Sequence, residues 1–171
     1  MKKRVIVWGT GNVGAPALRA VLSHQDLELV GVVVSSEAKD GKDAGELAEL
    51  GVVTGVKATR DWRGLIARGA DAVVYAALAE VRFEEAVEEV LECLRAGINV
   101  VTSTMYFLQY AATAPEPLAS EIREITAKSG ASLMASGIDP GWGMDSLPLF
   151  LSAISSDITE IRSREIFNYK H

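Results

Sequence analysis

The amino-acid sequence predicts an α/β fold, in which a doubly wound parallel sheet of about six or more strands carries helices on both faces. Six short apolar segments alternate along the 171 residues with segments of helical periodicity. The first apolar segment runs directly into Gly-x-Gly-x-x-Gly at residues 9–14, and a helical segment follows at once. The second is a nearly continuous, mostly β-branched run at residues 29–34, which is typical of a parallel strand covered on both faces.

Strands and helices alternate in a regular order from the N-terminus. The helix after the glycine turn has Val13, Ala17 and Val21 at helical spacing, and the third strand is weak because Gly55 interrupts it. Asp61 precedes a short helical segment and is a residue type that caps helices. The strands are expected at residues 4–8, 27–35, 52–59, 72–76, 98–102 and 131–135. The helices are expected at residues 12–23, 62–68, 83–95, 115 or 117 to 128, and 144–154, with a shorter one within residues 41–50.

The helix at residues 83–95 is strongly amphipathic, with Ala86, Val90 and Leu94 on one face. Five acidic residues lie mainly on its other faces and could suggest a metal site. Acids on a helix more often form a solvated face, so we predict a solvated face and no metal site. They are Glu84, Glu85, Glu88, Glu89 and Glu92. Cys93, on the apolar face, is expected to be a small core residue rather than a nucleophile.

Composition and charge argue against several classes of function. The net charge is −6 and the basic residues form no stripe, so we expect no nucleic-acid partner. No apolar stretch reaches the ~18 residues of a membrane span, and the apolar run at residues 5–8 is too short for a signal peptide. A single cysteine fits a reducing compartment, so a cytoplasmic protein without membrane association is expected. The two histidines, His24 and His171, lie at a helix end and at the chain terminus and are not expected to be catalytic.

The glycine turn predicts a dinucleotide site. Gly9 allows the turn, Gly11 lets a pyrophosphate approach the backbone, and Gly14 lets the helix lie close to the strand. Unpaired N–H groups and the positive end of the helix dipole then face the phosphates. The strand before, the helix after and a second strand one unit later provide the context that this motif requires.

The end of the second strand bears on the choice between NAD and NADP. An acidic residue there would bind the ribose 2′-hydroxyl of NAD. This chain has Ser35 and Ser36 at that point, with Lys39 nearby, and these suit a 2′-phosphate better, so NADP is favoured. Glu37 keeps NAD open if its side chain turns inward, and Lys39 and Lys42 could equally belong to a solvated loop.

A second motif, Gly-Ile-Asp-Pro-Gly at residues 137–141, follows the sixth strand. Its Asp-Pro-Gly forms a rigid turn, and the carboxylate of Asp139 could hold a cationic amine near the nicotinamide. Alternatively, Asp139 caps the helix expected at residues 144–154. In a doubly wound sheet this turn lies on the same rim as the loops at residues 9–14, 35–39, 76–79 and 102–105.

Residues 8–14 and 137–141 together resemble the superfamily of NAD(P)-dependent dehydrogenases that act on C–N bonds. It includes dihydrodipicolinate reductase, meso-diaminopimelate dehydrogenase, saccharopine reductase, 2,4-diaminopentanoate dehydrogenase and related amine dehydrogenases. The resemblance covers essentially the whole chain as their N-terminal Rossmann domain. It implies an oxidoreductase that transfers hydride to or from the carbon of an imine, amine or amino acid, with NADP or NAD as cofactor.

The resemblance also implies roles for individual residues. Residues 76–78 and 102–104 would flank the nicotinamide ribose, and Asp139 would lie beside the substrate. The loop after the fifth strand lacks the carboxylate of amine-dehydrogenating members; Tyr106 could donate a proton there, although packing is the commoner role of such a tyrosine. The candidate catalytic residues are Asp139 and Tyr106. The candidate cofactor-binding residues are Gly9, Thr10, Gly11, Asn12, Val13, Gly14, Ser35, Ser36, Lys39, Ala76, Ala77, Leu78, Thr102 and Ser103.

Residues 158–171 begin to alternate between apolar and polar, as a half-buried strand does. Members of the superfamily enter a second α/β domain at this point, with substrate contacts and the dimer interface. We therefore assign residues 1–155 to a dinucleotide-binding domain and 156–171 to the start of a second domain, with a homo-oligomer expected. Two other functions stay open: a non-catalytic NAD(P)-binding module, and a dehydrogenase of hydroxy substrates.

Overall fold

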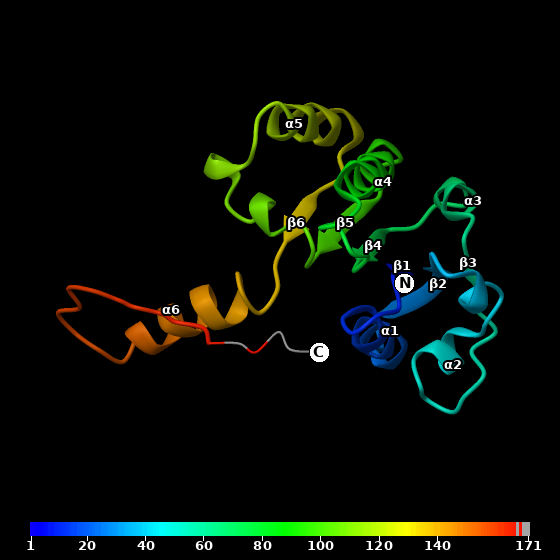
Figure 1. The fold of residues 1–171 in the computed structure, drawn as a ribbon, viewed down its shortest axis with the longest axis horizontal. Helices are drawn as coiled ribbons and strands as arrows, with labels where there is room; N and C mark the ends of the chain where they lie inside the picture. Colours follow the sequence, from blue (N-terminus) through cyan, green and yellow to red (C-terminus); the bar gives the residue numbers. More distant parts are fainter. Residues whose placement is uncertain (167, 169–171) are drawn as a thin grey trace.

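The fold is built on a six-stranded sheet in which every strand runs parallel to its neighbours, in the order β3-β2-β1-β4-β5-β6 (Figure 1). The computed structural model describes residues 1–166 and 168. The predicted doubly wound α/β fold is confirmed. The strands are β1 Lys3–Trp8, β2 Leu27–Val33, β3 Ala58–Thr59, β4 Ala72–Tyr75, β5 Asn99–Thr102 and β6 Leu133–Ala135.

Helices connect the strands, mostly near the predicted positions. Helix α4 spans Phe83–Arg95 as predicted, and Asp61 caps α3, Trp62–Ala67, by accepting a hydrogen bond from the N–H of Gly64 at 2.9 Å. Helix α5, Leu118–Ser129, ends at Gly130. The remaining helices are α1 Gly14–Ser23, α2 Ala44–Leu47 and α6 Leu147–Ser152, with short 3₁₀ turns at Glu37–Lys39, Tyr106–Leu108 and Ala111–Thr113.

Alternating side chains of the strands build two apolar cores, one on each face of the sheet. On β1, Val5 and Val7 pack in the core beneath α1 and α2. Ile6 and Trp8 pack in the other core, beneath α3, α4 and α5. All four side chains are at most 3% exposed, so β1 is buried on both faces, as expected for a central parallel strand.

The strand order reverses beside β1. The chain moves outward from β1 to β3, returns to β4 on the other side of β1, and then moves outward again to β6. In parallel sheets of this kind, ligands bind beyond the carboxyl ends of the strands at the reversal point. This topology directs attention to the loops after Trp8 and Tyr75, the last residues of β1 and β4.

Strand β3 is shorter than predicted because the chain before it folds around a side chain instead of extending. The carboxylate of Asp43 accepts hydrogen bonds from the N–H groups of Gly45, Thr54 and Gly55 at 2.8, 2.9 and 2.9 Å, and from the Thr54 hydroxyl at 3.0 Å. Of residues 52–59, which were predicted to form this strand, only Ala58 and Thr59 pair with β2. These hydrogen bonds, led by the one from the Thr54 N–H, lower the pKa of Asp43 to about 2.

We expect Asp43→Asn to lower the unfolding midpoint at neutral pH, because asparagine keeps the shape and loses the charge that these donors stabilise. The folded-state pKa is depressed, so this stabilisation is present above the unfolded-state pKa of about 3.9 and is lost as the pH falls toward 2. Thermal melts of both proteins should therefore differ at pH 7 and converge near the acid end of that window. Asp26→Asn, at an exposed position, is the control, and a gap independent of pH would contradict the assignment.

The helix expected at residues 144–154 is instead a π-helical turn, Trp142–Ser146, followed by α6. The carbonyl oxygen of Gly141 accepts hydrogen bonds from the N–H groups of both Asp145 and Ser146, at 3.1 and 3.0 Å, and this widens the first turn.

The strand expected from residue 158 is not formed in residues 158–166, which are neither helix nor strand and are mostly exposed. Within the described part of the chain, no neighbouring strand pairs with them. The rest of that expected strand, residues 167 and 169–171, lies outside the described residues. Helix α6 and the segment after it extend away from the sheet (Figure 1). No helix among the described residues is long and apolar enough to cross a membrane.

Candidate functional site

A cleft of about 430 Å³ opens at the reversal point, beyond the carboxyl ends of β1, β2 and β4. It is formed by the glycine turn and by the loops that follow β2, β4 and β5, four of the five loops predicted to share one rim. Most of the predicted cofactor-binding residues line it. The lining residues are Gly9, Thr10, Gly11, Asn12, Val13, Val34, Ser35, Ser36, Lys39, Ala76, Leu78 and Thr104.

The outer glycines of the turn are required by close backbone packing. Gly9 has a φ of +97°, and a Cβ there would lie 2.8 Å from the carbonyl oxygen of Ala76. A Cβ at Gly14 would overlap the carbonyl group of Gly9. Helix α1 can therefore begin this close to the end of β1 only with glycine at its first position.

The middle glycine has a different role. Apart from its two chain neighbours, no described residue has an atom within 4 Å of the place that a Cβ of Gly11 would take, so the space in front of the turn is open. Among the residues that the structure describes, no protein acceptor pairs with the N–H groups of Gly11, Asn12 and Val13. These groups lie just before α1, at the positive end of its dipole. The turn thus forms a cradle with the shape and polarity for an anionic group such as a pyrophosphate.

Lys39 links the loop after β2 to the glycine turn. Its Nζ donates hydrogen bonds to the carbonyl oxygen and to the hydroxyl of Thr10, at 3.0 and 3.1 Å. The ammonium group is thereby held at the wall of the cleft, and Lys39 is not simply part of a solvated loop. Ser35 and Ser36 are exposed beside it, whereas Glu37 is exposed and is not among the lining residues.

A second compartment of about 430 Å³ adjoins the cleft, and the two share Gly9, Val34, Ser35 and Leu78. Its aromatic wall is formed by Trp8 and Trp62, whose rings lie 5.3 Å apart. The predicted residue Ala77 lines this compartment rather than the cleft. Two arginines, Arg60 and Arg82, and the carboxylate of Glu89 complete the lining.

The prediction of a solvated acidic face on α4 is wrong for Glu89. It is only 6% exposed, and its carboxylate accepts hydrogen bonds from the hydroxyl of Tyr75 at 2.5 Å and from the guanidinium of Arg82 at 2.6 and 3.1 Å. Burial, together with the bond to Glu89, raises the pKa of Tyr75 and keeps the phenol protonated. Glu88 and Glu92 do face solvent, where both pair with Arg95. In the described part of the chain, no cluster of three or more acidic, His or Cys side chains is arranged to hold a metal.

Cys93 is fully buried in the core beneath α4, as predicted. Burial raises the pKa of its thiol to about 12, so the thiol stays protonated.

The loops after β5 and β6 adjoin each other beside the cleft. Thr102 is buried and its Oγ1 lies 3.2 Å from Oγ1 of Thr104, whereas Ser103 is exposed. The carboxylate of Asp145 ties the two loops together, because it accepts hydrogen bonds from Gln109 at 2.8 Å and from the N–H of Gly141 at 2.7 Å. Asp145, not Asp139, is thus the carboxylate that binds a backbone N–H of this turn.

Neither candidate catalytic residue lines the cleft. Asp139 is exposed on the turn after β6 and lies against Glu165, whose pKa is raised by a hydrogen bond between the two carboxyl groups. Tyr106 is 57% exposed and its ring packs edge-on against Phe107, with centroids 5.9 Å apart. The carboxylate of Asp139 is therefore free of the capping role that the sequence left open.

Sequence reasoning missed several residues that line the two compartments. Thr104 could have been found, because it follows the end of β5 in a loop already chosen. Trp8, Val33 and Val34 could also have been found, because they end the strands before two predicted loops. The others lie on segments that carry no motif, and only the packing of the fold brings them to the rim. They are Arg60, Trp62, Arg82 and Glu89.

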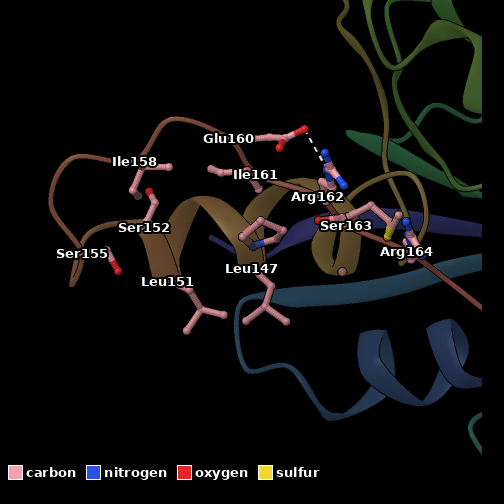
Figure 2. A pocket seen from close by; sticks show the side chains of 13 residues that line it. Leu147, Leu151, Ser152, Ser155, Ile158, Glu160, Ile161, Arg162, Ser163 and Arg164 are labelled. Atoms are coloured by element: carbon pink, nitrogen blue, oxygen red, sulfur yellow. Dashed lines mark hydrogen bonds and ion pairs between the residues drawn. The ribbon is translucent and has the colours of Figure 1, made fainter.

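A separate groove of about 530 Å³ lies away from the cleft, between α6 and residues 158–164. Figure 2 shows Leu147 and Leu151 on the helix and Ile158 and Ile161 on the opposite segment. Phe150, on α6, is 84% exposed. This end of the molecule therefore presents apolar side chains that no described part of the chain covers.

Comparisons with known proteins match the chain to dehydrogenases. The family described as dihydrodipicolinate reductase, N-terminus, matches residues 3–128. An amine dehydrogenase of Streptomyces virginiae is 46% identical over 164 residues, and a 2,4-diaminopentanoate dehydrogenase of Acetoanaerobium sticklandii is 26% identical over 180. Each alignment covers 96% of this chain and 46% of the relative, so the chain spans about half the length of the curated relatives it matches.

The chain also resembles solved structures. An amine dehydrogenase from Mycobacterium smegmatis superposes with a TM-score of 0.75 and 26% identity, over 92% of this chain and 46% of that one. Biliverdin reductase from Synechocystis, solved with biliverdin and NADP⁺, superposes with a TM-score of 0.58 and 20% identity, over 80% and 38%. The second match is a likeness of fold alone.

Proposed function

Since the chain belongs to the dihydrodipicolinate reductase N-terminal family, we propose that it is the cofactor domain of an NAD(P)-dependent oxidoreductase acting on amines. The observation that carries this proposal is the 46% identity to an amine dehydrogenase, which extends over 96% of the chain. In this proposal the whole protein transfers hydride to or from the carbon of an amine, imine or amino acid.

The open space at Gly11 supports a dinucleotide in the cleft, because a side chain there would fill the room that a pyrophosphate needs. The N–H groups of residues 11–13 would hold the phosphates, and residues 76–78 would border the sugars. Thr102 and Ser103 would lie beside the nicotinamide ribose. The bound nicotinamide supplies the hydride chemistry, and the protein supplies its orientation and the electrostatics of the substrate site.

We propose NADP rather than NAD as the cofactor. The ammonium of Lys39, held 3.1 Å from the Thr10 hydroxyl, and the exposed hydroxyls of Ser35 and Ser36 surround the end of β2. A 2′-phosphate would find a cation and hydroxyl donors there, and no lining carboxylate would repel it.

Lys39→Ala is expected to weaken NADPH binding by about tenfold or more, because a charge-assisted hydrogen bond is lost, and to leave NADH binding nearly unchanged. Isothermal titration with the two cofactors measures the difference. Lys57→Ala is the matched control, because Lys57 is exposed, its Nζ donates to the carbonyl oxygen of Gly41 at 3.4 Å, and it does not line the cleft. An equal loss for both cofactors, or no loss, would rule out recognition of the 2′-phosphate by Lys39.

Asp139 is the proposed contact for the cationic amine, since it is exposed on the turn beside Ser103; in this proposal the amine takes the place of the Glu165 carboxyl group that now lies against it. Asp139→Asn should raise KM for amines about tenfold, because a charged hydrogen bond is lost, with NADPH affinity unchanged. The test is amine oxidation by the full-length protein, followed through the absorbance of the reduced nicotinamide. NADPH binding without turnover of any amine would instead favour a non-catalytic module, and turnover of hydroxy compounds would favour an alcohol or sugar dehydrogenase.

We also propose that residues 1–155 form one domain and that a second α/β domain begins at residue 156. The exposed apolar side chains around the groove of Figure 2 support this, since a second domain would cover them. In this proposal the second domain carries further substrate contacts and the homo-oligomer interface. The cytoplasm is the proposed compartment, because the single cysteine is buried and forms no intrachain disulfide.

A further inference from the structure

The buried carboxylate of Glu89 joins three parts of the chain at the rim of the sheet. Tyr75 is the last residue of β4, Arg82 immediately precedes α4, and Glu89 lies in the middle of α4. The hydrogen bonds of 2.5, 2.6 and 3.1 Å satisfy both carboxylate oxygens. The network therefore fixes the two ends of the loop at residues 76–82.

This loop borders both compartments of the site. Ala76 lines the cleft, Ala77 and Arg82 line the second compartment, and Leu78 lines both. Leu78 and Val81 are 56% and 80% exposed, and Ala79, 2% exposed, is the loop's one fully buried side chain. The position of the loop therefore depends on this small apolar contact and on what holds its ends.

Stability alone does not account for a charged network here. A buried ion pair is often no more stabilising than apolar side chains of the same volume, because both charges must leave water. What this network does is fix the direction of the Arg82 side chain. Glu89 accepts hydrogen bonds from two N–H groups of Arg82, and the Arg82 side chain stays one-third exposed on the wall of the second compartment.

The second compartment has the chemistry of a site for a flat, electron-rich ring. Trp62 provides a half-buried aromatic side chain, backed by the buried Trp8 and with the guanidinium of Arg63 4.0 Å from its ring centroid. The guanidinium groups of Arg60 and Arg82 provide planar cations that can stack on a heteroaromatic ring. The compartment adjoins Ser35, where the adenosine ribose of the proposed cofactor would lie. An adenine ring fits this combination of aromatic surface, planar cations and neighbouring ribose site.

We propose that Glu89 and Tyr75 are positioning residues that hold Arg82 and the loop at residues 76–82 for the adenine end of the dinucleotide. This inference rests on the proposed function. Tyr75 does not line the second compartment. Glu89 does, but its two carboxylate oxygens accept hydrogen bonds from Tyr75 and Arg82, so both residues act through Arg82 and the ends of the loop. A loss of either is expected to affect the adenosine half of the cofactor and to spare the nicotinamide half.

The test compares Glu89→Gln and Tyr75→Phe with the wild type in the full-length protein. The probes are adenosine 2′,5′-bisphosphate and nicotinamide mononucleotide, each measured by displacement of NADPH. Glu89→Gln should weaken the adenosine probe about tenfold and change the nicotinamide probe by less than about twofold, because the charge that orients Arg82 is lost. Glu88→Gln is the matched control on the same helix, since Glu88 is exposed and pairs with Arg95.

Equal weakening of both probes, or an unchanged adenosine probe in folded Glu89→Gln protein, would overturn the inference. Tyr75→Phe keeps the ion pair and carries the same test if Glu89→Gln does not fold. It should weaken only the adenosine probe, by about threefold, and no change would again overturn the inference. A wild-type protein that binds neither NADPH nor NADH would overturn the proposed function and this inference with it. If the wild type binds NADPH but neither variant loses affinity for the adenosine probe selectively, the inference is overturned and the proposed function stands.

Discussion

Replacing Gly11 with valine is expected to abolish dinucleotide binding and to leave the fold intact. Beyond the two chain neighbours of Gly11, no atom of the described residues lies within 4 Å of the place that a Cβ would occupy, so the described part of the chain presents no steric obstacle to valine. The same side chain fills the space in front of the N–H groups of Asn12 and Val13, where the pyrophosphate is proposed to bind. We expect the affinity for NADPH to fall at least about 100-fold, which corresponds to about 2.7 kcal/mol.

The measurement is isothermal titration of NADPH, with a thermal melt of each variant. Gly11→Ala provides a matched series, because its single methyl group should give a smaller loss than valine. The unfolding midpoint should stay within a few degrees of the wild type, since an exposed substitution usually changes stability by less than about 0.5 kcal/mol. An unchanged affinity in folded Gly11→Val protein would show that the pyrophosphate does not bind at this turn.

The fold could be predicted because its signals are local. The alternation of Val5 and Val7 with Ile6 and Trp8, followed by three spaced glycines, specifies a buried strand, a tight turn and a helix within one short segment. The length of α4 was predicted in the same way from its apolar stripe. The capping role of Asp61 was predicted from its position just before a helical segment. The doubly wound parallel arrangement then followed from the alternation of strands and helices, without any knowledge of tertiary contacts.

The burial of Glu89 could not be predicted from the helix alone. Helical spacing places Glu88, Glu89 and Glu92 among the acids of α4, and nothing in the helix distinguishes them. The difference arises because Tyr75 and Arg82 supply a hydroxyl and a guanidinium to one of them, and these partners come from outside α4. A buried charge is thus decided by distant partners, and periodicity carries no information about them.

The short β3 and the start of the helix after β6 were predicted wrongly for a related reason. In both places one carboxylate holds a loop: Asp43 accepts hydrogen bonds from three backbone N–H groups before β3, and Asp145 accepts from the N–H of Gly141 and from Gln109 after β6. Asp139 was the candidate for capping the following helix, but it is Asp145 that accepts a hydrogen bond from a backbone N–H of this turn, that of Gly141. Residues of the same type six positions apart are indistinguishable until the loop geometry is known.

Gly14→Ala is expected to destabilise the protein by about 3 kcal/mol or more, because the new methyl group would overlap the backbone carbonyl of Gly9. Backbone atoms cannot rotate away as a flexible side chain can, so α1 would have to move from the end of β1. That shift would disturb the contacts of Leu18 and Val21, which are buried against Val5 and Val7 in the same core. A loss of this size should lower the unfolding midpoint by about 10 °C in a chain of this length.

The sign of this effect makes the test sharp. At an unobstructed helix position, glycine to alanine stabilises by about 0.5–1 kcal/mol, since alanine loses less backbone entropy on folding. Gly14→Ala should therefore reverse the usual direction, whereas Gly11→Ala, three residues earlier and in open space, should leave the midpoint nearly unchanged. A midpoint in Gly14→Ala equal to or above that of the wild type would show that α1 does not approach the strand end as closely as described. The two substitutions therefore distinguish the roles of the two glycines. Gly14 lets α1 pack against the end of β1, and Gly11 leaves room for a ligand in the cradle.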